Sequence, residues 1–70
     1  MQQEQAQITI VAPARGVTIR LASIITGLSE KAIRRKIEDG KWIEGKEYHR
    51  RDGGIYVDLD GYYRWVRGQG

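Results

Sequence analysis

The segment GLSEKAIRRKIEDGKW, Gly27 to Trp42, carries the clearest helix signals in the sequence. Ser29 is a residue type that caps the start of a helix, Glu30 follows near the positive end of the helix dipole, and Gly40 stands where a helix ends. The run between them predicts one short helix that carries both acids and bases. Its exposed face can either read DNA or be no more than a charged, solvated surface.

A helical projection separates this segment into two faces at ~100° per residue. Its apolar face holds Ala32, Ile33 and Ile37, and its polar face holds Lys31, Arg34, Arg35 and Glu38. An arginine on an exposed helix face can hold guanine through two hydrogen bonds, and a lysine can hold a phosphate. The polar face is therefore a candidate recognition surface.

Two further features of this helix leave the interpretation open. Lys36 falls on the core-facing arc, so we expect it to extend toward a phosphate or toward solvent rather than read a base. Arg34 and Glu38 are four residues apart and can form an ion pair worth about 0.3 kcal/mol on a solvated face. For the helix alone, neither DNA reading nor simple solvation is excluded.

The residues before Gly27 predict a preceding helix. Apolar residues recur at the i, i+3, i+4 and i+7 spacing of one helix face, at Leu21, Ile24, Ile25 and Leu28. Thr18 is an acceptable N-cap, and Gly27 suits the left-handed residue that ends a helix. Two short helices joined through TGLS give a helix-turn-helix.

After Trp42 the pattern changes to strands. KEYHRRDGGIYVDL (46–59) reads as two strands around RDGG, because Asp-Gly-Gly supplies the positive φ angles of a tight hairpin turn. Asp60 is expected to cap a last short helix, in which Tyr62, Trp65 and Val66 close the core. The order helix, helix, hairpin, helix predicts an α+β fold, a small winged helix-turn-helix domain.

The ends of the chain complete this division. The Gln-rich residues 1–7 are expected to be a disordered lead-in, and ITIVAP (8–13) to be a short N-terminal strand or extended arm. The winged-helix domain is assigned to 8–67, and 68–70 to a frayed C-terminus.

Composition narrows the class of function. A chain of 70 residues is one small domain, and without cysteine it has neither disulfides nor thiolate metal ligands. Without an apolar span or a signal peptide, the expectation is a soluble cytoplasmic protein. The net charge of +3 mildly favours an anionic partner. Residues 29–51 hold eight of the twelve cations, with five acids among them: Glu30, Glu38, Asp39, Glu44 and Glu47.

The hairpin adds a second basic element. Its turn is expected to bring His49, Arg50 and Arg51 to the tip, where they can lie along a DNA backbone or enter a minor groove. The alternative is a charged hairpin end that only resists edge pairing. Because two separate basic elements are harder to explain by solubility, DNA binding is favoured.

Enzymatic chemistry is not supported by the sequence. His49 is the single histidine, and no cysteine or acidic cluster stands at metal-ligand spacing around it. No nucleophile–base pair and no phosphate-binding glycine loop can be assigned. We therefore expect neither catalysis nor a cofactor, and we assign Trp42 and Trp65 to the core.

The sequence resembles the small phage and prophage excisionase-like proteins over residues 10–66. The resemblance rests on the Thr-Gly-Leu-Ser turn, the Ala-Ile-Arg-Arg-Lys helix, the Gly-Lys-Trp exit and the Asp-Gly hairpin that leads into Tyr-x-x-Trp-Val. It implies a winged-helix architectural factor without cofactor or catalytic activity. Such factors bind attachment-site DNA cooperatively, bend it, and direct a phage integrase of the tyrosine recombinase type toward prophage excision. The implied location is the cytoplasm of a bacterial host, on its nucleoid.

Carried across, the resemblance places Lys31, Arg34 and Arg35 in the major groove, and Arg50 and Arg51 on the backbone or minor groove beside the wing. Ser29 would cap the recognition helix and donate to a phosphate. The complete set of predicted DNA contacts is Ser29, Lys31, Arg34, Arg35, Lys36, Lys46, His49, Arg50 and Arg51. Family members usually continue beyond the last helix with an extension that often contacts the recombinase, whereas this chain stops at RGQG.

Two other functions remain open at this point. The same fold also serves small transcriptional regulators of prophage genes. A protein-interaction module that inhibits a host regulator through its helical surface is the third reading, and it predicts partner binding that survives the loss of Arg34 and Arg35.

Overall fold

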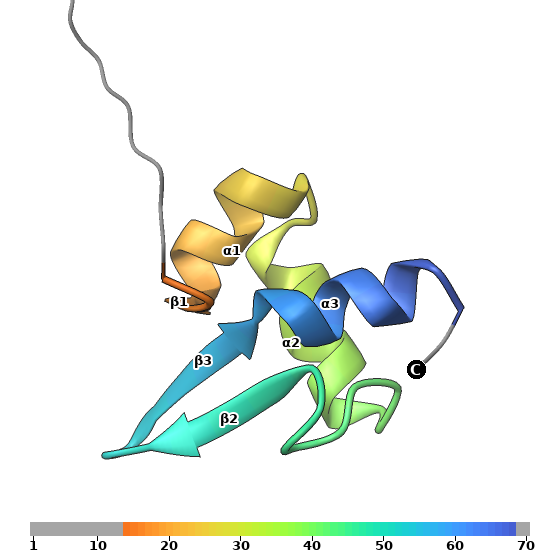
Figure 1. The fold of residues 1–70 in the computed structure, drawn as a ribbon. Helices are drawn as coiled ribbons and strands as arrows, with labels where there is room; N and C mark the ends of the chain where they lie inside the picture. The colour runs from red at the N-terminus through yellow and green to blue at the C-terminus, as the bar shows by residue number, and fades with distance from the viewer. Residues whose placement is uncertain (1–13, 69–70) are drawn as a thin grey trace, which may run out of the picture.

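The computed structural model describes residues 14–68, which form three helices and a three-stranded antiparallel sheet (Figure 1). The elements are, in order, β1 (Gly16–Thr18), α1 (Ile19–Thr26), α2 (Glu30–Glu38), β2 (Tyr48–Arg51), β3 (Gly54–Asp58) and α3 (Leu59–Val66). This is the α+β class expected from the sequence, and it is compatible with a winged-helix-like fold. The predicted lead-in (1–7), the predicted strand at 8–13 and residues 69–70 lie outside the described residues.

The sheet is built around β3, with β1 on one side and β2 on the other. Strand β1 was not foreseen, because three residues that include a glycine show no alternating pattern. Val17 pairs with Val57, and the two side chains are only 3% and 0% exposed. This pair lies at the centre of the fold, where α1 contacts both β1 and β3.

The predicted hairpin is confirmed. Asp52 and Gly53 are the two central residues of the turn, and both have positive φ, 52° and 78°. Two successive positive φ angles are typical of the type I′ turn, whose twist matches that of the flanking strands. The Asp-Gly pair therefore fixes the register in which Arg51 faces Gly54.

The predicted caps of the first two helices are also confirmed. Oγ1 of Thr18 accepts a hydrogen bond from the N–H of Leu21 at 3.2 Å, and Gly27 ends α1 with a left-handed φ of 84°. Oγ of Ser29 accepts from the N–H of Ala32 at 3.0 Å. These short polar side chains hold α1 and α2 on either side of a tight turn.

The cap of α3 differs from the prediction. Asp58, not Asp60, is the N-cap, and its Oδ1 accepts from the N–H of Gly61 at 2.9 Å. The helix begins two residues early because β3 runs into it without a loop. Asp60 instead lies in the first turn, where its Oδ2 is 3.3 Å from Nη1 of Arg15.

The predicted apolar face of α1 is not the face that packs. Leu21, Ile24 and Ile25 are 42%, 72% and 49% exposed, whereas Ile19 and Ala22 are buried. The reason is that β1 leads directly into α1. Val17 faces the core and Thr18 caps the helix, and together they fix the rotation of α1 about its axis so that Ile19 points into the core. The side that reaches the core carries smaller residues than the sequence pattern suggested.

The core forms around Trp42, as predicted. Its side chain is 1% exposed, and its ring meets those of Tyr62 and Trp65 edge-on, with centroids 6.1 Å and 5.6 Å apart. Such edge-to-face pairs add about 1 kcal/mol each beyond the area they bury. Val66 was expected here as well, but it is the last residue of α3 and is 53% exposed.

The loop between Trp42 and β2 is held by a hydrogen bond to a buried side chain of the loop itself. Glu47 is only 3% exposed, and its Oε1 accepts from the backbone N–H of Ile43 at 2.8 Å. From the sequence, Glu47 was counted among the acids that lie between the surface cations. In the structure it is buried instead. The backbone of Lys46 and Glu47 lies directly against Gly61 of α3, close enough that no side chain fits between them.

Candidate nucleic-acid interface

The exposed face of α2 has the composition predicted for it. Ile33 is fully buried, while Lys31, Arg34, Arg35 and Glu38 are exposed and line a shallow hollow along the helix. The helix is held at its start by Ser29 and packs on the core through Ile33 and Ile37. The three cations thus stand on a rigid element and point to solvent.

The ion pair that a merely solvated face would contain, between Arg34 and Glu38, is absent from the described residues. Within residues 14–68, Lys31, Arg34 and Arg35 take part in no ion pair, and Arg34 does not contact the carboxylate of Glu38. An i, i+4 pair would have favoured a merely solvated face. Free guanidinium groups retain all their donors for an anionic partner.

Lys36 lies at the border between the core-facing side of α2 and its exposed face, as the helical projection predicted. Its Nζ lies 5.4 Å from the centroid of the Trp65 ring, an arrangement that a cation–π attraction stabilises. The same side chain borders a shallow hollow together with Ser29, Lys31 and Arg35. Its stem covers the core while its charge stays at the edge of the α2 face, so a phosphate contact stays a prediction.

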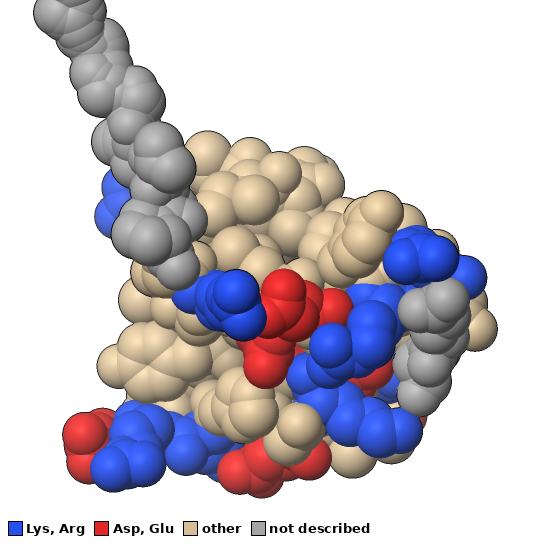
Figure 2. Space-filling model, viewed as in Figure 1, with Lys and Arg blue, Asp and Glu red and all other residues tan. Residues whose placement is uncertain are grey.

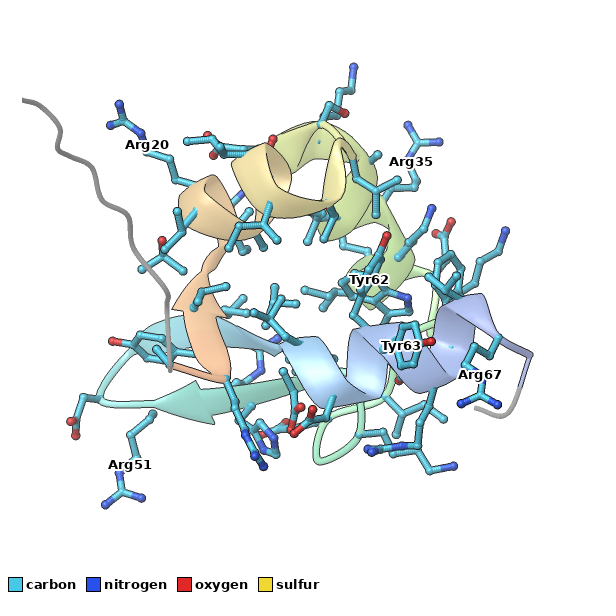
Figure 3. All side chains as sticks on the ribbon, turned by 45° about the horizontal axis from the view of Figure 1, so that its top comes forward. Arg20, Arg35, Arg51, Tyr62, Tyr63 and Arg67 are labelled. Atoms are coloured by element: carbon cyan, nitrogen blue, oxygen red, sulfur yellow. The ribbon has the colours of Figure 1, made fainter. Side chains whose placement is uncertain are left out.

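Only one of the three predicted tip residues is at the hairpin tip. Arg51 adjoins the turn and faces Gly54, whereas His49 lies two residues back, opposite Tyr56. In Figure 3, Arg51 projects from the end of the hairpin away from α1 and α2. The prediction for His49 was wrong because the turn consists of Asp52 and Gly53 alone, so β2 extends through all the basic residues.

Arg50 faces the helices rather than the tip. Side chains alternate along a strand, so Arg50 shares its side of β2 with the buried Tyr48, and its guanidinium lies 5.7 Å from the centre of that ring. Its Nε is 3.7 Å from Oε1 of Glu44, and it lines a groove with Arg34 of α2. Arg50 therefore links the hairpin to the α2 face.

Lys46 lies beside the start of α3. It is exposed in the loop before β2, and its backbone packs against Gly61 at the start of α3. The sequence placed it among the predicted contacts because it lies within the cationic stretch 29–51, whereas the fold turns this loop toward α3.

His49 contacts the cap of α3. Its Nε2 lies 2.8 Å from Oδ2 of Asp58, whose Oδ1 holds the N–H of Gly61. Burial by itself raises the pKa of Asp58, but the hydrogen bond from His49 and those from the backbone outweigh it, so the pKa of Asp58 lies below its ordinary value of 3.8. His49 is thus a structural partner of the α3 cap.

This arrangement predicts a loss of stability in acid. Because the pKa of Asp58 is lower in the folded protein, its carboxylate stabilises the fold above the ordinary value of 3.8, and this contribution is lost as the pH falls through the folded pKa. Asn also caps helices but does not titrate, so Asp58→Asn should flatten the dependence of the melting temperature on pH between about pH 5 and pH 2. Thermal melts followed by circular dichroism check this. A melting temperature that falls equally in both proteins would contradict it.

Positive charge is spread over several elements. On the face shown in Figure 2, Lys and Arg gather at the end of the hairpin and, separately, around the end of α3, with acids beside both groups. Figure 3 shows Arg20 and Arg35 projecting from the helices on different sides. Arg20 was not predicted as a contact, because it lies outside the cation-rich stretch 29–51. It is exposed and lines a groove with Arg34.

Other kinds of site are not indicated in the described part of the chain. Between residues 14 and 68, no group of three or more His, Asp or Glu side chains is arranged to hold a metal ion. In the same range, none of the helices has the length and apolar character needed to cross a membrane.

Comparison with known proteins identifies the family. The sequence profile of the family described as "Putative excisionase (DUF1233)" matches residues 8–69. No curated protein and no solved structure matches the chain. The matched range includes every described element from β1 to α3, and it agrees with the resemblance seen in the turn, helix and hairpin motifs. The chain therefore belongs to this family of excisionase-like proteins.

Proposed function

We propose that the protein is a winged helix-turn-helix excisionase that binds and bends attachment-site DNA. In this proposal α2 enters the major groove, the β2–β3 hairpin is the wing, and the bound DNA directs a tyrosine recombinase toward prophage excision. The protein performs no chemistry of its own. It acts on the host nucleoid, with several copies binding cooperatively along the site.

The observation that carries the proposal is the exposed face of α2. Lys31, Arg34 and Arg35 stand together without ion-pair partners among residues 14–68, on a helix that follows a tight turn. In helix-turn-helix proteins the second helix presents its exposed residues to base edges, and an arginine there reads guanine. Membership of the excisionase family supports the same role.

The hairpin supplies the second contact. In this proposal Arg51, next to the turn, meets a phosphate or enters a narrow minor groove. The position of Arg51 opposite Gly54 supports this, and Arg50 lines a groove with Arg34 of α2. Of the other predicted contacts, Ser29 and Lys36 border the α2 face, while Lys46 and His49 lie toward α3 and are assigned no base reading.

A recombination assay tests the function. A plasmid carrying the two prophage attachment sites is incubated with the tyrosine recombinase that acts on these sites, with and without the protein. Excision should depend on the protein and should fall strongly when Arg34 and Arg35 are both replaced by Ala. Full excision without the protein would contradict the proposal. Repression of a nearby promoter without any effect on excision would make it a transcriptional regulator of the same fold.

One observation favours a different function. Leu21, Ile24 and Ile25 form an apolar exposed strip on α1, and such strips can mark protein-interaction sites. A module that inhibits a host regulator would use this surface. Its partner binding would survive the loss of Arg34 and Arg35 and would fail when Ile24 is replaced by a charged residue, whereas no duplex DNA would be bound.

A further inference from the structure

Arg20 lies on α1, outside the two elements that carry the proposed DNA contacts. It is the second residue of α1 and is exposed, and its guanidinium takes part in no ion pair within residues 14–68. Its side chain projects freely from the helix in Figure 3. This leaves a cation without any described partner.

The position is unfavourable for the helix itself. The first turn of α1 contains no acidic residue and has Arg20 instead. Acids stabilise the start of a helix and cations its end, so a cation here opposes the helix dipole. A residue that breaks a local rule without a structural gain is more often one that serves function.

The surroundings of Arg20 join it to the proposed interface. Arg20, Glu30 and Arg34 line one groove, to which the hairpin contributes Gly53, Gly54 and Ile55. The groove thus runs between α1, α2 and the tip of the hairpin. Arg20 could have served to neutralise Glu30, but the described residues contain no ion pair between them.

We propose that Arg20 is a contact to a DNA phosphate and that one strand of the duplex follows this groove. A guanidinium holds a phosphate through two parallel N–H donors. On the hairpin side of the groove, Gly53 and Gly54 contribute no side chains, and Ile55 contributes an apolar one that carries no charge to repel a phosphate. Because phosphates are the same at every base pair, Arg20 contributes affinity and orientation but no choice of sequence. This inference rests on the proposed DNA-binding function.

The test compares Arg20→Ala with Arg67→Ala. Arg67 carries the same charge but follows α3, where it stacks on Tyr63 with its guanidinium 5.5 Å from the ring centre, far from Arg20 in Figure 3. Binding of each protein to an attachment-arm duplex and to a random duplex is titrated at two salt concentrations. One lost phosphate contact lowers the salt slope by about 0.9, so a ~4-fold rise in salt should weaken Arg20→Ala about 3.5-fold less than the wild type. Arg20→Lys should keep the wild-type slope.

Each outcome decides the matter. A reduced slope in Arg20→Ala, with an unchanged ratio of site to random binding and little change in Arg67→Ala, supports the phosphate contact. If the two substitutions reduced the salt slope equally, Arg20 would act only through the net charge of the protein, and the proposal would be overturned. If Arg20→Ala changed the ratio of site to random binding, Arg20 would read a base, and the proposal would also be overturned. Arg34→Ala is measured in parallel. If it weakens binding while Arg20→Ala does not, only the α1 contact fails; if the wild type binds neither duplex, the proposed function itself fails.

Discussion

Gly61→Ala is expected to lower the free energy of unfolding by about 3 kcal/mol or more. A Cβ at this position would meet the carbonyl oxygen of Lys46 and would lie 2.7 Å from the carbonyl carbon of Lys46 and 2.9 Å from Cα of Glu47. All three are backbone atoms, and the buried carboxylate of Glu47 fixes this loop through the N–H of Ile43. The methyl group can therefore be accommodated only if α3 moves away from the loop, which opens the packing around Trp42.

Chemical denaturation followed by tryptophan fluorescence measures this effect, and Gly16→Ala is its control. A Cβ at Gly16 would have Tyr56 Cβ as its nearest neighbour at 4.0 Å, an ordinary contact, and Gly16 has no positive φ. Its stability should stay within about 0.5 kcal/mol of the wild type. If both variants unfolded at the same denaturant concentration as the wild type, α3 would not pack against this loop.

The second large effect is expected at Arg34, which borders the hollow on α2 and both grooves toward α1 and the hairpin. As the most central cation of the proposed interface, it should read a base edge. Arg34→Ala is expected to reduce discrimination between the attachment site and random DNA by about 1–3 kcal/mol, the value of a good arginine–guanine contact. Competition titrations with the two duplexes measure the discrimination.

Arg51→Ala is the matched comparison for Arg34→Ala. A contact to the DNA backbone affects all sequences alike, so Arg51→Ala should weaken binding to both duplexes by a similar factor and reduce the salt slope by about one. The roles assigned to α2 and the hairpin are wrong if Arg34→Ala leaves the ratio of attachment-site to random binding unchanged and Arg51→Ala alters that ratio.

Local signals in the sequence were sufficient for most of the fold. Thr18, Gly27 and Ser29 fix helix ends through hydrogen bonds or backbone angles that involve only a few neighbouring residues, and Asp52 and Gly53 do the same for the hairpin. These features depend little on the rest of the chain, so the residue types alone predict them.

The features that failed depend on contacts between distant segments. The rotation of α1 is set by the pairing of Val17 with Val57, 40 residues later, and so the strip of Leu21, Ile24 and Ile25 was assigned to the wrong side. The tight approach of Gly61 to the backbone of Lys46 leaves no mark in the sequence beyond one glycine in a short helix. A helical pattern gives the periodicity of a face but not the partner that covers it.

In the candidate site, too, the features that depend on local geometry were predicted, and those that depend on distant contacts were not. The separation of Lys31, Arg34 and Arg35 from Ile33 follows from helix geometry alone and is confirmed. The position of His49 depended on the length of the turn, and the proximity of Arg20 to Arg34 depends on how α1 packs on α2. Arg20 stands alone in its part of the sequence, outside the cation-rich stretch 29–51, so charge density along the chain does not single it out.

DNA binding by α2 and the hairpin can be measured in a gel-shift titration of the protein on an attachment-arm duplex and on a random duplex of equal length, at low and at moderate salt. We expect binding that weakens steeply with salt and a clear preference for the attachment arm. Because the DNA is bent, the mobility of the complex should change with the position of the site within the fragment. Salt-sensitive binding without preference would leave only a generic basic domain. No shift with either duplex would contradict the central claim that α2 and the hairpin form a DNA-binding surface.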